Sequence, residues 1–156
     1  MTDVSVITGG AGGIGLATAK IVVREHPVVI CDVSAERLST AIDALRGDAI
    51  DAVVVRCDIT DRDSVAGLIQ SATSLGTVVS LIHTAGVSPS MGSAELIMKI
   101  NAVGTVNVNE AFLPHAQEGF VSVNVASMAA YLVPRIVIPK SVFIVRSTTT
   151  RFSSRR

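Results

Sequence analysis

The sequence predicts an α/β fold in which a doubly wound parallel sheet has the strand order 3-2-1-4-5. Short, nearly continuous apolar runs recur along the chain, as is typical of parallel strands that are buried on both faces. Helical stretches separate these runs, so that strands and helices alternate. Right-handed crossovers wind such an alternation into one sheet with helices on both faces, and a ligand binds at the carboxyl ends of the strands where the order reverses.

The alternation extends from the N-terminus to residue 125. A proline or a glycine follows each of the first three predicted helices as a stop signal. Ser34 and Thr60 stand where N-caps are expected, and Thr60 with Asp63 resembles a capping box. The strands are expected at Val4–Thr8, Val28–Cys31, Ala52–Cys57, Val78–Thr84 and Phe120–Val125, and the helices at Gly13–Arg24, Ala35–Leu45, Asp61–Leu75 and Ser93–Ala116.

A glycine-rich turn connects the first predicted strand to the first helix. The turn Thr8–Gly15 reads TGGAGGIG, which fits G-x-G-x-x-G from Gly10 and G-x-x-x-G-x-G from Gly9. Glycines allow the backbone to turn sharply and to approach a pyrophosphate, whose charge is then met by free N–H groups and the positive end of the helix dipole. Either spacing therefore predicts a dinucleotide site.

An acidic residue ends the second predicted strand. Asp32 follows the run Val28–Cys31 at the distance from the glycine turn, about 20 residues, where dinucleotide-binding proteins place the acid that binds ribose hydroxyls. Its alternative role is a helix N-cap, although Ser34 is better placed for that. Because a carboxylate repels a 2′-phosphate and no neighbouring cation offsets it, NAD is favoured over NADP. Arg37 could bend back toward the ribose, but a solvated helix charge is the favoured interpretation.

Composition narrows the class of protein. With 156 residues and 49% hydrophobic content, the chain can bury one core and does not require a second domain. Its apolar runs are shorter than the roughly 18 residues of a membrane helix, and no signal core follows the N-terminus, so we expect a cytoplasmic protein without membrane contact. Cys31 and Cys57 lack the further partners of a metal site, so we expect no metal and two packed thiols close to each other.

Charge divides the chain near Pro134. Residues 1–134 carry 7 Lys and Arg against 13 Asp and Glu, whereas residues 135–156 carry six cations and no acid. We therefore expect a nucleotide-binding domain over residues 1–134 and a basic, poorly ordered tail over residues 135–156. The tail contains few aromatic residues, which disfavours a nucleic-acid partner.

Further phrases in the same order resemble the short-chain dehydrogenase/reductase family. They are CDIT from Cys57, HTAG from His83, INAVG from Ile100 and VNVAS from Val123, and TGGAGGIG matches the family's TGxxxGIG. The resemblance covers about residues 3–134. His83 stands where the family commonly has asparagine, and we interpret it as a structural residue rather than a general base.

The resemblance assigns cofactor-binding roles. It implies that Asp58 and the Ile59 backbone hold the adenine, and that Ala85 and Gly86 lie along the cofactor at the end of the fourth strand. The cofactor-binding residues expected here are Gly9, Gly13, Ile14, Gly15, Asp32, Asp58, Ile59, Ala85 and Gly86.

The resemblance also assigns two catalytic residues. Asn101 matches the family's helix asparagine, which kinks its helix and holds a water of the proton relay, and Ser127 matches the serine that bonds the substrate oxygen. Without the resemblance, Asn101 would be an ordinary mid-helix polar residue and Ser127 a serine in a turn after a strand.

The family's Tyr-x-x-x-Lys pair is not found in this sequence. The only tyrosine, Tyr131, is followed at i+4 by Arg135, with Pro134 between them, which disfavours the helix that the pair requires. A whole member has roughly 250 residues, the size of a substantial α/β domain, so we expect a chain that is cut short or altered after residue 134, without the family's C-terminal strands.

Two functions follow from these observations. The first is an NAD-dependent oxidoreductase that acts on a secondary alcohol or ketone, including hydroxysteroid-like substrates, and forms a homo-oligomer as the family does. The second is a non-catalytic NAD-binding fragment or pseudoenzyme, because Asn101 and Ser127 lack the acid that would complete the site.

Overall fold

The protein is described by a computed structural model over residues 2–127. Met1–Val125 forms one compact unit, and the residues from Ala126 onward belong to a second unit, of which only Ala126 and Ser127 are described. The predicted domain boundary at residue 134 and the predicted tail over residues 135–156 lie outside the described residues.

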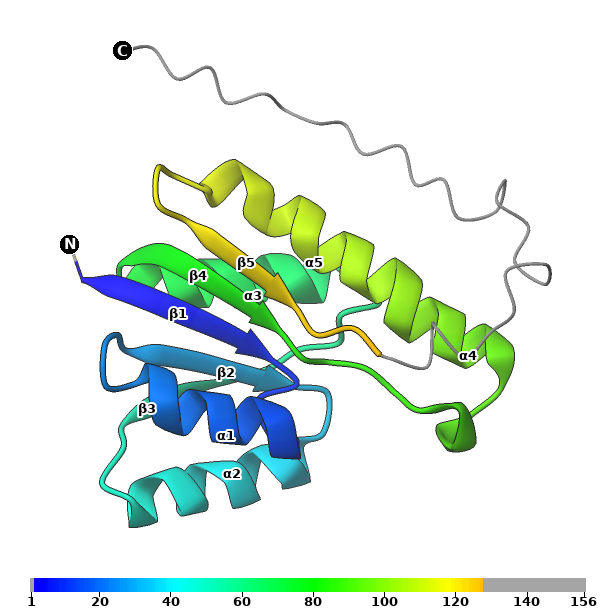
Figure 1. Cartoon of the computed structure of the whole chain (residues 1–156), viewed down its shortest axis with the longest axis horizontal. Helices are drawn as coiled ribbons and strands as arrows, with labels where there is room; N and C mark the ends of the chain where they lie inside the picture. Colours follow the sequence, from blue (N-terminus) through cyan, green and yellow to red (C-terminus); the bar gives the residue numbers. More distant parts are fainter. Residues whose placement is uncertain (1, 128–156) are drawn as a thin grey trace. The chain divides into compact units, whose positions relative to one another are not determined.

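Five parallel strands form the sheet, in the predicted order β3-β2-β1-β4-β5 (Figure 1). In the register, Thr8 at the end of β1 lies between Cys31 of β2 and His83 of β4. The carboxyl ends of the three central strands therefore meet at one edge of the sheet. The strands are β1 Asp3–Thr8, β2 Val28–Asp32, β3 Ala52–Arg56, β4 Thr77–His83 and β5 Val121–Asn124.

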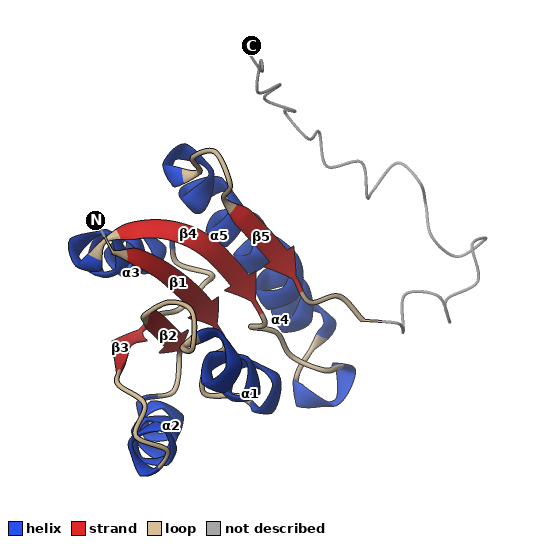
Figure 2. Ribbon diagram, turned by 60° about the vertical axis from the view of Figure 1, so that its left-hand side comes forward, coloured by secondary structure: helices blue, strands red, loops and turns tan. Residues whose placement is uncertain are grey.

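Helices cover both faces of the sheet, as the doubly wound fold predicts (Figure 2). Helices α1 and α2 pack on one face, and α3 and α5 pack on the other. The helices are α1 Gly13–Val22, α2 Ala35–Gly47, α3 Arg62–Leu75, α4 Ala94–Met98 and α5 Thr105–Phe112, with a π-helix at Lys99–Gly104 and 3₁₀ turns at Pro89–Met91 and Leu113–His115.

Alternation along the strands divides the core into two layers. Val4 and Val6 of β1 pack with Leu68 of α3 and Phe112 of α5, whereas Ile7 packs on the opposite side with α1 and α2. Successive side chains of a strand point to opposite faces, which is why one apolar run supplies both layers.

One local expectation, the N-cap of α3, was wrong. Thr60 is not the N-cap of α3, because its hydroxyl and N–H both donate to Asp58 Oδ1, and the Asp61 carboxylate caps the helix by accepting from the Asp63 N–H at 3.0 Å. Ser34, in contrast, caps α2 as predicted. The long helix expected at Ser93–Ala116 is confirmed as one helical stretch, in which α4, the π-helix Lys99–Gly104, α5 and the 3₁₀ turn Leu113–His115 follow one another without a gap.

Within residues 2–127, no helix combines the length and the apolar character that crossing a membrane requires.

Candidate cofactor site

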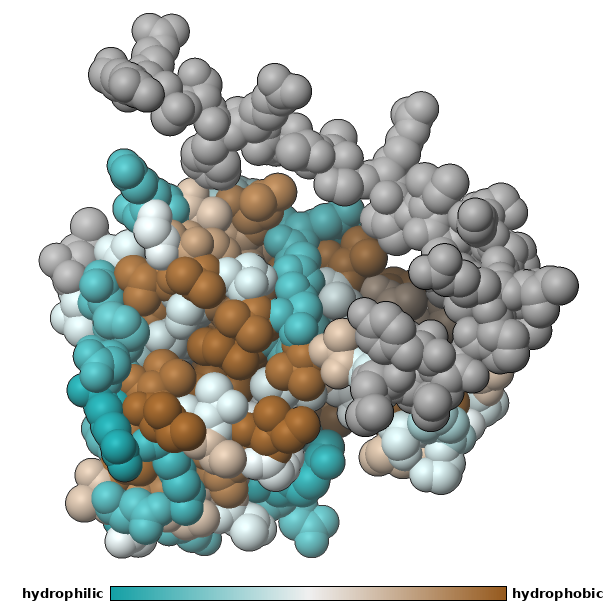
Figure 3. Space-filling view, viewed as in Figure 1, coloured by the Kyte–Doolittle hydropathy of each residue, from teal (hydrophilic) through white to brown (hydrophobic). Residues whose placement is uncertain are grey.

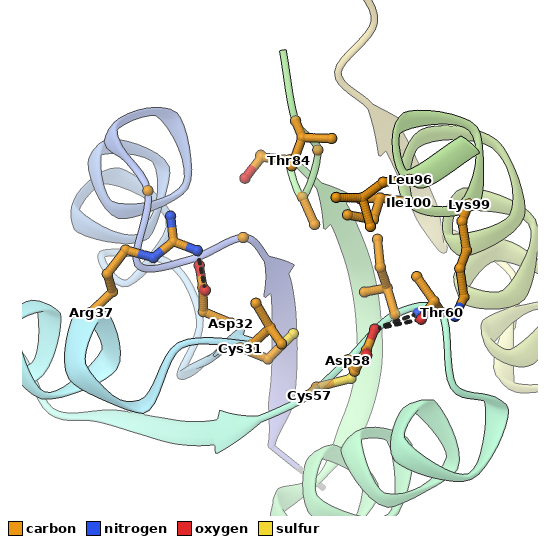
Figure 4. Close-up of a pocket in the computed structure, with 17 residues that line it drawn as sticks. Cys31, Asp32, Arg37, Cys57, Asp58, Thr60, Thr84, Leu96, Lys99 and Ile100 are labelled. Carbon is orange, nitrogen blue, oxygen red and sulfur yellow. Dashed lines mark hydrogen bonds and ion pairs between the residues drawn. The ribbon is translucent and has the colours of Figure 1, made fainter. Parts of the chain in front are cut away.

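A cavity of about 380 Å³ opens at the carboxyl edge of the sheet (Figure 4). Its walls come from the glycine turn after β1, the ends of β2 and β3, the segment after β4 and the helix region around Lys99. Six of the nine residues predicted to bind the cofactor line it, namely Gly9, Asp32, Asp58, Ile59, Ala85 and Gly86. The other three, Gly13, Ile14 and Gly15, begin α1 directly after Gly12, which does line the cavity.

The glycine turn is packed so closely that side chains would not fit at three positions, Gly9, Gly10 and Gly15. Gly9 has a φ of +66°, and a Cβ on it would lie 2.7 Å from the Ala85 backbone nitrogen. A Cβ on Gly15 would collide with the Gly9 carbonyl oxygen. A Cβ on Gly10 would lie 2.5 Å from Ile30 Cβ, so both spacings have a steric basis: one contains Gly9 and Gly15, and the other contains Gly10 and Gly15.

The opposite holds at the start of α1. A Cβ on Gly13 would meet no protein atom within 4 Å, and the N-cap residue Gly12 has no side chain with which to cap the first turn. Backbone N–H groups at such a helix start, together with the helix dipole, suit an anion. The turn is thus closely packed against the sheet, whereas the start of α1 is open to solvent. This combination fits the pyrophosphate of a dinucleotide.

Asp32 is buried at the end of β2 and forms an ion pair. Its Oδ1 accepts from Arg37 Nη2 at 2.7 Å and from the Ser34 N–H at 3.1 Å. The interpretation of Arg37 as a solvated helix charge was therefore wrong. Ser34 caps α2 through the Arg37 N–H, which places Arg37 in the first turn, close enough for its side chain to fold back onto β2.

Asp58 and Ile59 follow β3 on the other side of the cavity. Asp58 Oδ1 is held by the N–H and the hydroxyl of Thr60, at 2.9 and 2.8 Å, and the Asp58 N–H donates to Ser64 Oγ. The Ile59 carbonyl accepts from the Nδ2 of buried Asn107 at 3.1 Å. These hydrogen bonds fix both residues in the loop that lines the cavity.

The segment after β4 is clamped by Asn101. Its Oδ1 accepts from the Val87 N–H at 2.9 Å, and its Nδ2 donates to the Val87 carbonyl at 2.8 Å. A Cβ on Gly86 would lie 3.3 Å from Asn101 Oδ1, so the segment passes close to this amide. Asn101 lies inside the π-helix Lys99–Gly104, as a residue that distorts its helix would. It does not itself line the cavity.

His83 has a structural setting, as expected from the sequence. Nδ1 pairs with Thr8 Oγ1 at 2.6 Å and Nε2 pairs with Thr105 Oγ1 at 2.9 Å, so both ring nitrogens are engaged. Burial lowers the pKa of His83 below its usual value, because desolvation disfavours the charged imidazolium. The neutral ring links β1 to α5 through the end of β4.

Cys31 and Cys57 are buried neighbours, as predicted, and both line the cavity. A hydrogen bond between the two thiols, together with burial, raises the pKa of Cys31, and the same hydrogen bond lowers the pKa of Cys57. No cluster of three metal-binding side chains occurs in the described part of the chain.

Ser127 lies three residues beyond β5 and belongs to the second unit, so the structure gives its place along the chain and not its distance from the cavity. Tyr131 and Arg135 lie outside the described residues.

Sequence reasoning missed the wall that the helix region contributes. Leu96, Lys99 and Ile100 line the cavity together, and Figure 4 shows Leu96 and Ile100 facing Asp32 across it, with Lys99 reaching toward Thr60. Their i, i+3 and i+4 spacing was the available signal. Asn107 was missed too, although an asparagine between Gly104 and Val108 on a buried helix face is a usable signal of a polar clamp.

Comparison with known proteins gives consistent results. The family profile described as short chain dehydrogenase matches residues 3–139. A curated relative, the short-chain dehydrogenase/reductase bsc3 of Alternaria brassicicola, is 30% identical over 131 residues, which cover 84% of this chain and 48% of the relative. The chain therefore spans about half the length of that relative.

Solved structures share the fold. A short-chain dehydrogenase/reductase from Burkholderia phymatum in complex with NAD is 28% identical, with a TM-score of 0.71 over 85% of this chain and 52% of that one. A variant actinorhodin polyketide ketoreductase with NADPH is 25% identical, with a TM-score of 0.65 over 73% of this chain and 47% of that one. With the glycine turn, the acid after β2 and the sheet order, these matches identify the chain as a member of the short-chain dehydrogenase family of oxidoreductases.

Proposed function

We propose that this chain binds NAD in the cavity at the carboxyl edge of the sheet, as part of an oxidoreductase that converts a secondary alcohol to a ketone or the reverse. The observation that carries the proposal is the pairing of an open, glycine-lined helix start with a buried carboxylate, Asp32, across the same cavity. A diphosphate suits the first and a ribose with free hydroxyls suits the second.

Most of the predicted residues have a direct binding role in this proposal, and Gly9 provides the sharp turn that precedes α1. The N–H groups of Gly13, Ile14 and Gly15 face the pyrophosphate, and Asp32 accepts from the adenosine ribose. Asp58 and the Ile59 backbone contact the adenine, and their fixed hydrogen bonds to Thr60 and Asn107 mean that little ordering is required on binding.

Ala85 and Gly86 continue the cofactor path after β4. The clamp between Asn101 and Val87 holds this segment in place, so Asn101 supports the cofactor path in addition to the relay role that the family resemblance suggests. Bound nicotinamide would supply the hydride acceptor or donor. Ser127 is proposed to bond the substrate oxygen, and the family resemblance is the support for that role.

A binding module without turnover is the second candidate, because the sequence contains one tyrosine, Tyr131, and lacks a lysine four residues after it. In that case the cavity would bind NAD, and the proton transfer that the reaction requires would have no donor. The substrate class, a secondary alcohol or ketone and hydroxysteroids among them, belongs to the first candidate.

Two further proposals concern the setting of the protein. The free thiols of Cys31 and Cys57 suit a reducing compartment, which supports a cytoplasmic location. Homo-oligomer formation is proposed from the family resemblance.

Titration of the full 156-residue chain with NADH, followed by nicotinamide fluorescence, tests the binding proposal. We expect saturable binding that Asp32→Ala weakens by tenfold or more, about 1.4 kcal/mol, while Asp43→Ala on the exposed face of α2 leaves it unchanged. Absence of binding by a chain that circular dichroism shows to be folded would contradict the proposal. Oxidation of secondary alcohols by NAD, measured with the same preparation, separates the enzyme from the binding module.

A further inference from the structure

Arg37 shares a compact network with the residue that is proposed to bind ribose. The Asp32 carboxylate accepts from the Ser34 N–H, Ser34 Oγ accepts from the Arg37 N–H, and Arg37 Nη2 donates back to Asp32 Oδ1. The Asp32 side chain is 5% exposed and the Arg37 side chain is 53% exposed. The network therefore fixes a buried acid with a cation on its solvent side.

Both charges face the cavity. Asp32 and Arg37 line it together with Val33, and Figure 4 shows the guanidinium lying alongside the carboxylate at one end of the cavity. The contacts from Ser34 and Arg37 use the same carboxylate oxygen, Oδ1. A ribose hydroxyl is then expected on Oδ2, next to the guanidinium.

The ion pair between Arg37 and Asp32 reduces the electrostatic preference of this site for NAD over NADP. A solitary carboxylate repels a 2′-phosphate, which carries close to two negative charges. A guanidinium 2.7 Å from the same carboxylate offsets that repulsion, because its positive charge cancels much of the negative charge at this end of the cavity. Arginine also presents several donors in a planar fork, so it can contact a phosphate after leaving the acid.

We infer that Arg37 is a specificity-determining residue, which admits NADP to the cavity as a second cofactor beside NAD. The inference rests on the proposed function, since it concerns the same cavity. With NAD, Arg37 stays on Asp32 and the acid binds the ribose hydroxyls. With NADP, the Arg37 guanidinium turns to the 2′-phosphate and offsets its charge, so that Asp32 is repelled less strongly by the phosphate.

The experiment uses calorimetry on the full chain with two probes of the adenosine half, 5′-AMP and adenosine 2′,5′-bisphosphate, followed by NADH and NADPH. We expect Arg37→Gln to weaken the 2′-phosphorylated ligands by tenfold or more, and the others by less than about threefold, because a charge-assisted hydrogen bond is lost for the former alone. Asp32→Ser should strengthen the 2′-phosphorylated ligands and weaken the others, and adding Arg37→Gln to it should remove that gain.

Arg62→Gln is the matched control. Arg62 pairs with Glu110 at 2.8 Å on the surface and does not line the cavity, so all four ligands should bind to this variant as to the original chain. The inference would be overturned if Arg37→Gln changed the affinities for both ligand classes equally, or for neither class. Either outcome would leave the proposed NAD binding by the original chain untouched. Failure of the folded original chain to bind any of the four ligands would overturn the proposed function instead, and the inference with it.

Discussion

Strands β2 and β5 show how differently the two sides of the sheet are supported. All five residues of β2 are buried, whereas all four residues of β5 are exposed. Val121 and Val123 of β5, with Val125 beyond it, are 53%, 46% and 46% exposed. Figure 3, in the same view as Figure 1, shows apolar side chains on the face of the molecule at which β1, β4 and β5 lie in front.

The supports of the two strands differ in kind. Helices α2 and α3 pack against β2 through two apolar layers. Strand β5 is held by its ladder to β4 and by an amide network in which Asn109 of α5 bonds Ser122 and Asn124. The side of the sheet that lines the cavity is thus stabilised by burial, and the strand that leads to Ser127 by a few polar contacts, so mutations on the two sides should have unequal effects.

The largest effect is expected from Gly9→Ala, in the turn that joins the buried side to the cavity. The left-handed φ costs about 1–2 kcal/mol for a residue with a side chain, and the new Cβ would lie 2.7 Å from the Ala85 nitrogen. We expect the free energy of unfolding to fall by about 2–4 kcal/mol and NADH binding to be lost. Urea denaturation and NADH fluorescence measure the two effects.

Gly67→Ala provides the control for that change. Gly67 lies inside α3, where a Cβ would meet no atom within 4 Å, so the variant should be more stable by about 0.5–1 kcal/mol and should bind NADH normally. Equal stability of the two alanine variants would contradict the steric account of the turn.

The same substitution in β2 and in β5 tests the comparison directly. Val29 is fully buried and Val123 is 46% exposed. Val29→Ala should lower the free energy of unfolding by about 2–3 kcal/mol through lost burial and a cavity, and Val123→Ala by less than about 1 kcal/mol. Comparable losses in chemical denaturation would show that β5 is packed as firmly as β2.

The sequence predicts the buried side better than the exposed side for a physical reason. Continuous apolar runs such as Val28–Cys31 mark buried parallel strands, and glycines mark backbone close to backbone, so the sheet order and the glycine turn could be predicted. The contact of Arg37 with Asp32 could not, because a long side chain has many rotamers and its partner is chosen by tertiary geometry. The distortion of the long helix around Asn101 was expected from the family resemblance alone.

A smaller effect is expected from Asn109→Ala, which removes the amide that ties α5 to β5. Asn109 accepts from Ser122 and Asn124 and donates to Asn124, at 2.8 to 3.2 Å. The partners remain accessible to water, so we expect a loss of about 1 kcal/mol in stability. Faster hydrogen exchange confined to β5 should accompany it. Exchange that accelerates equally in β2 would mean that the two sides unfold as one unit.

The smallest effect concerns His83, which joins the two sides through Thr8 on β1 and Thr105 on α5. Burial lowers its pKa in the folded protein, so the unfolded chain takes up the proton first as the pH falls. Above about pH 6.5 the ring is neutral in both states and contributes no pH dependence; below it, stability is lost until the folded pKa is reached.

Replacement of His83 by asparagine should remove this contribution. Between pH 7.5 and pH 6.0 the original chain should lose up to about 0.8 kcal/mol that His83→Asn does not lose. Denaturation of both proteins at the two pH values measures this difference in stability loss. The two proteins share the same carboxylates, so the contribution of carboxylate titration cancels in the comparison. A larger loss in the variant would mean that a protonated His83 stabilises the fold, and that the junction between the two sides is held by charge rather than by a neutral ring between two hydroxyls.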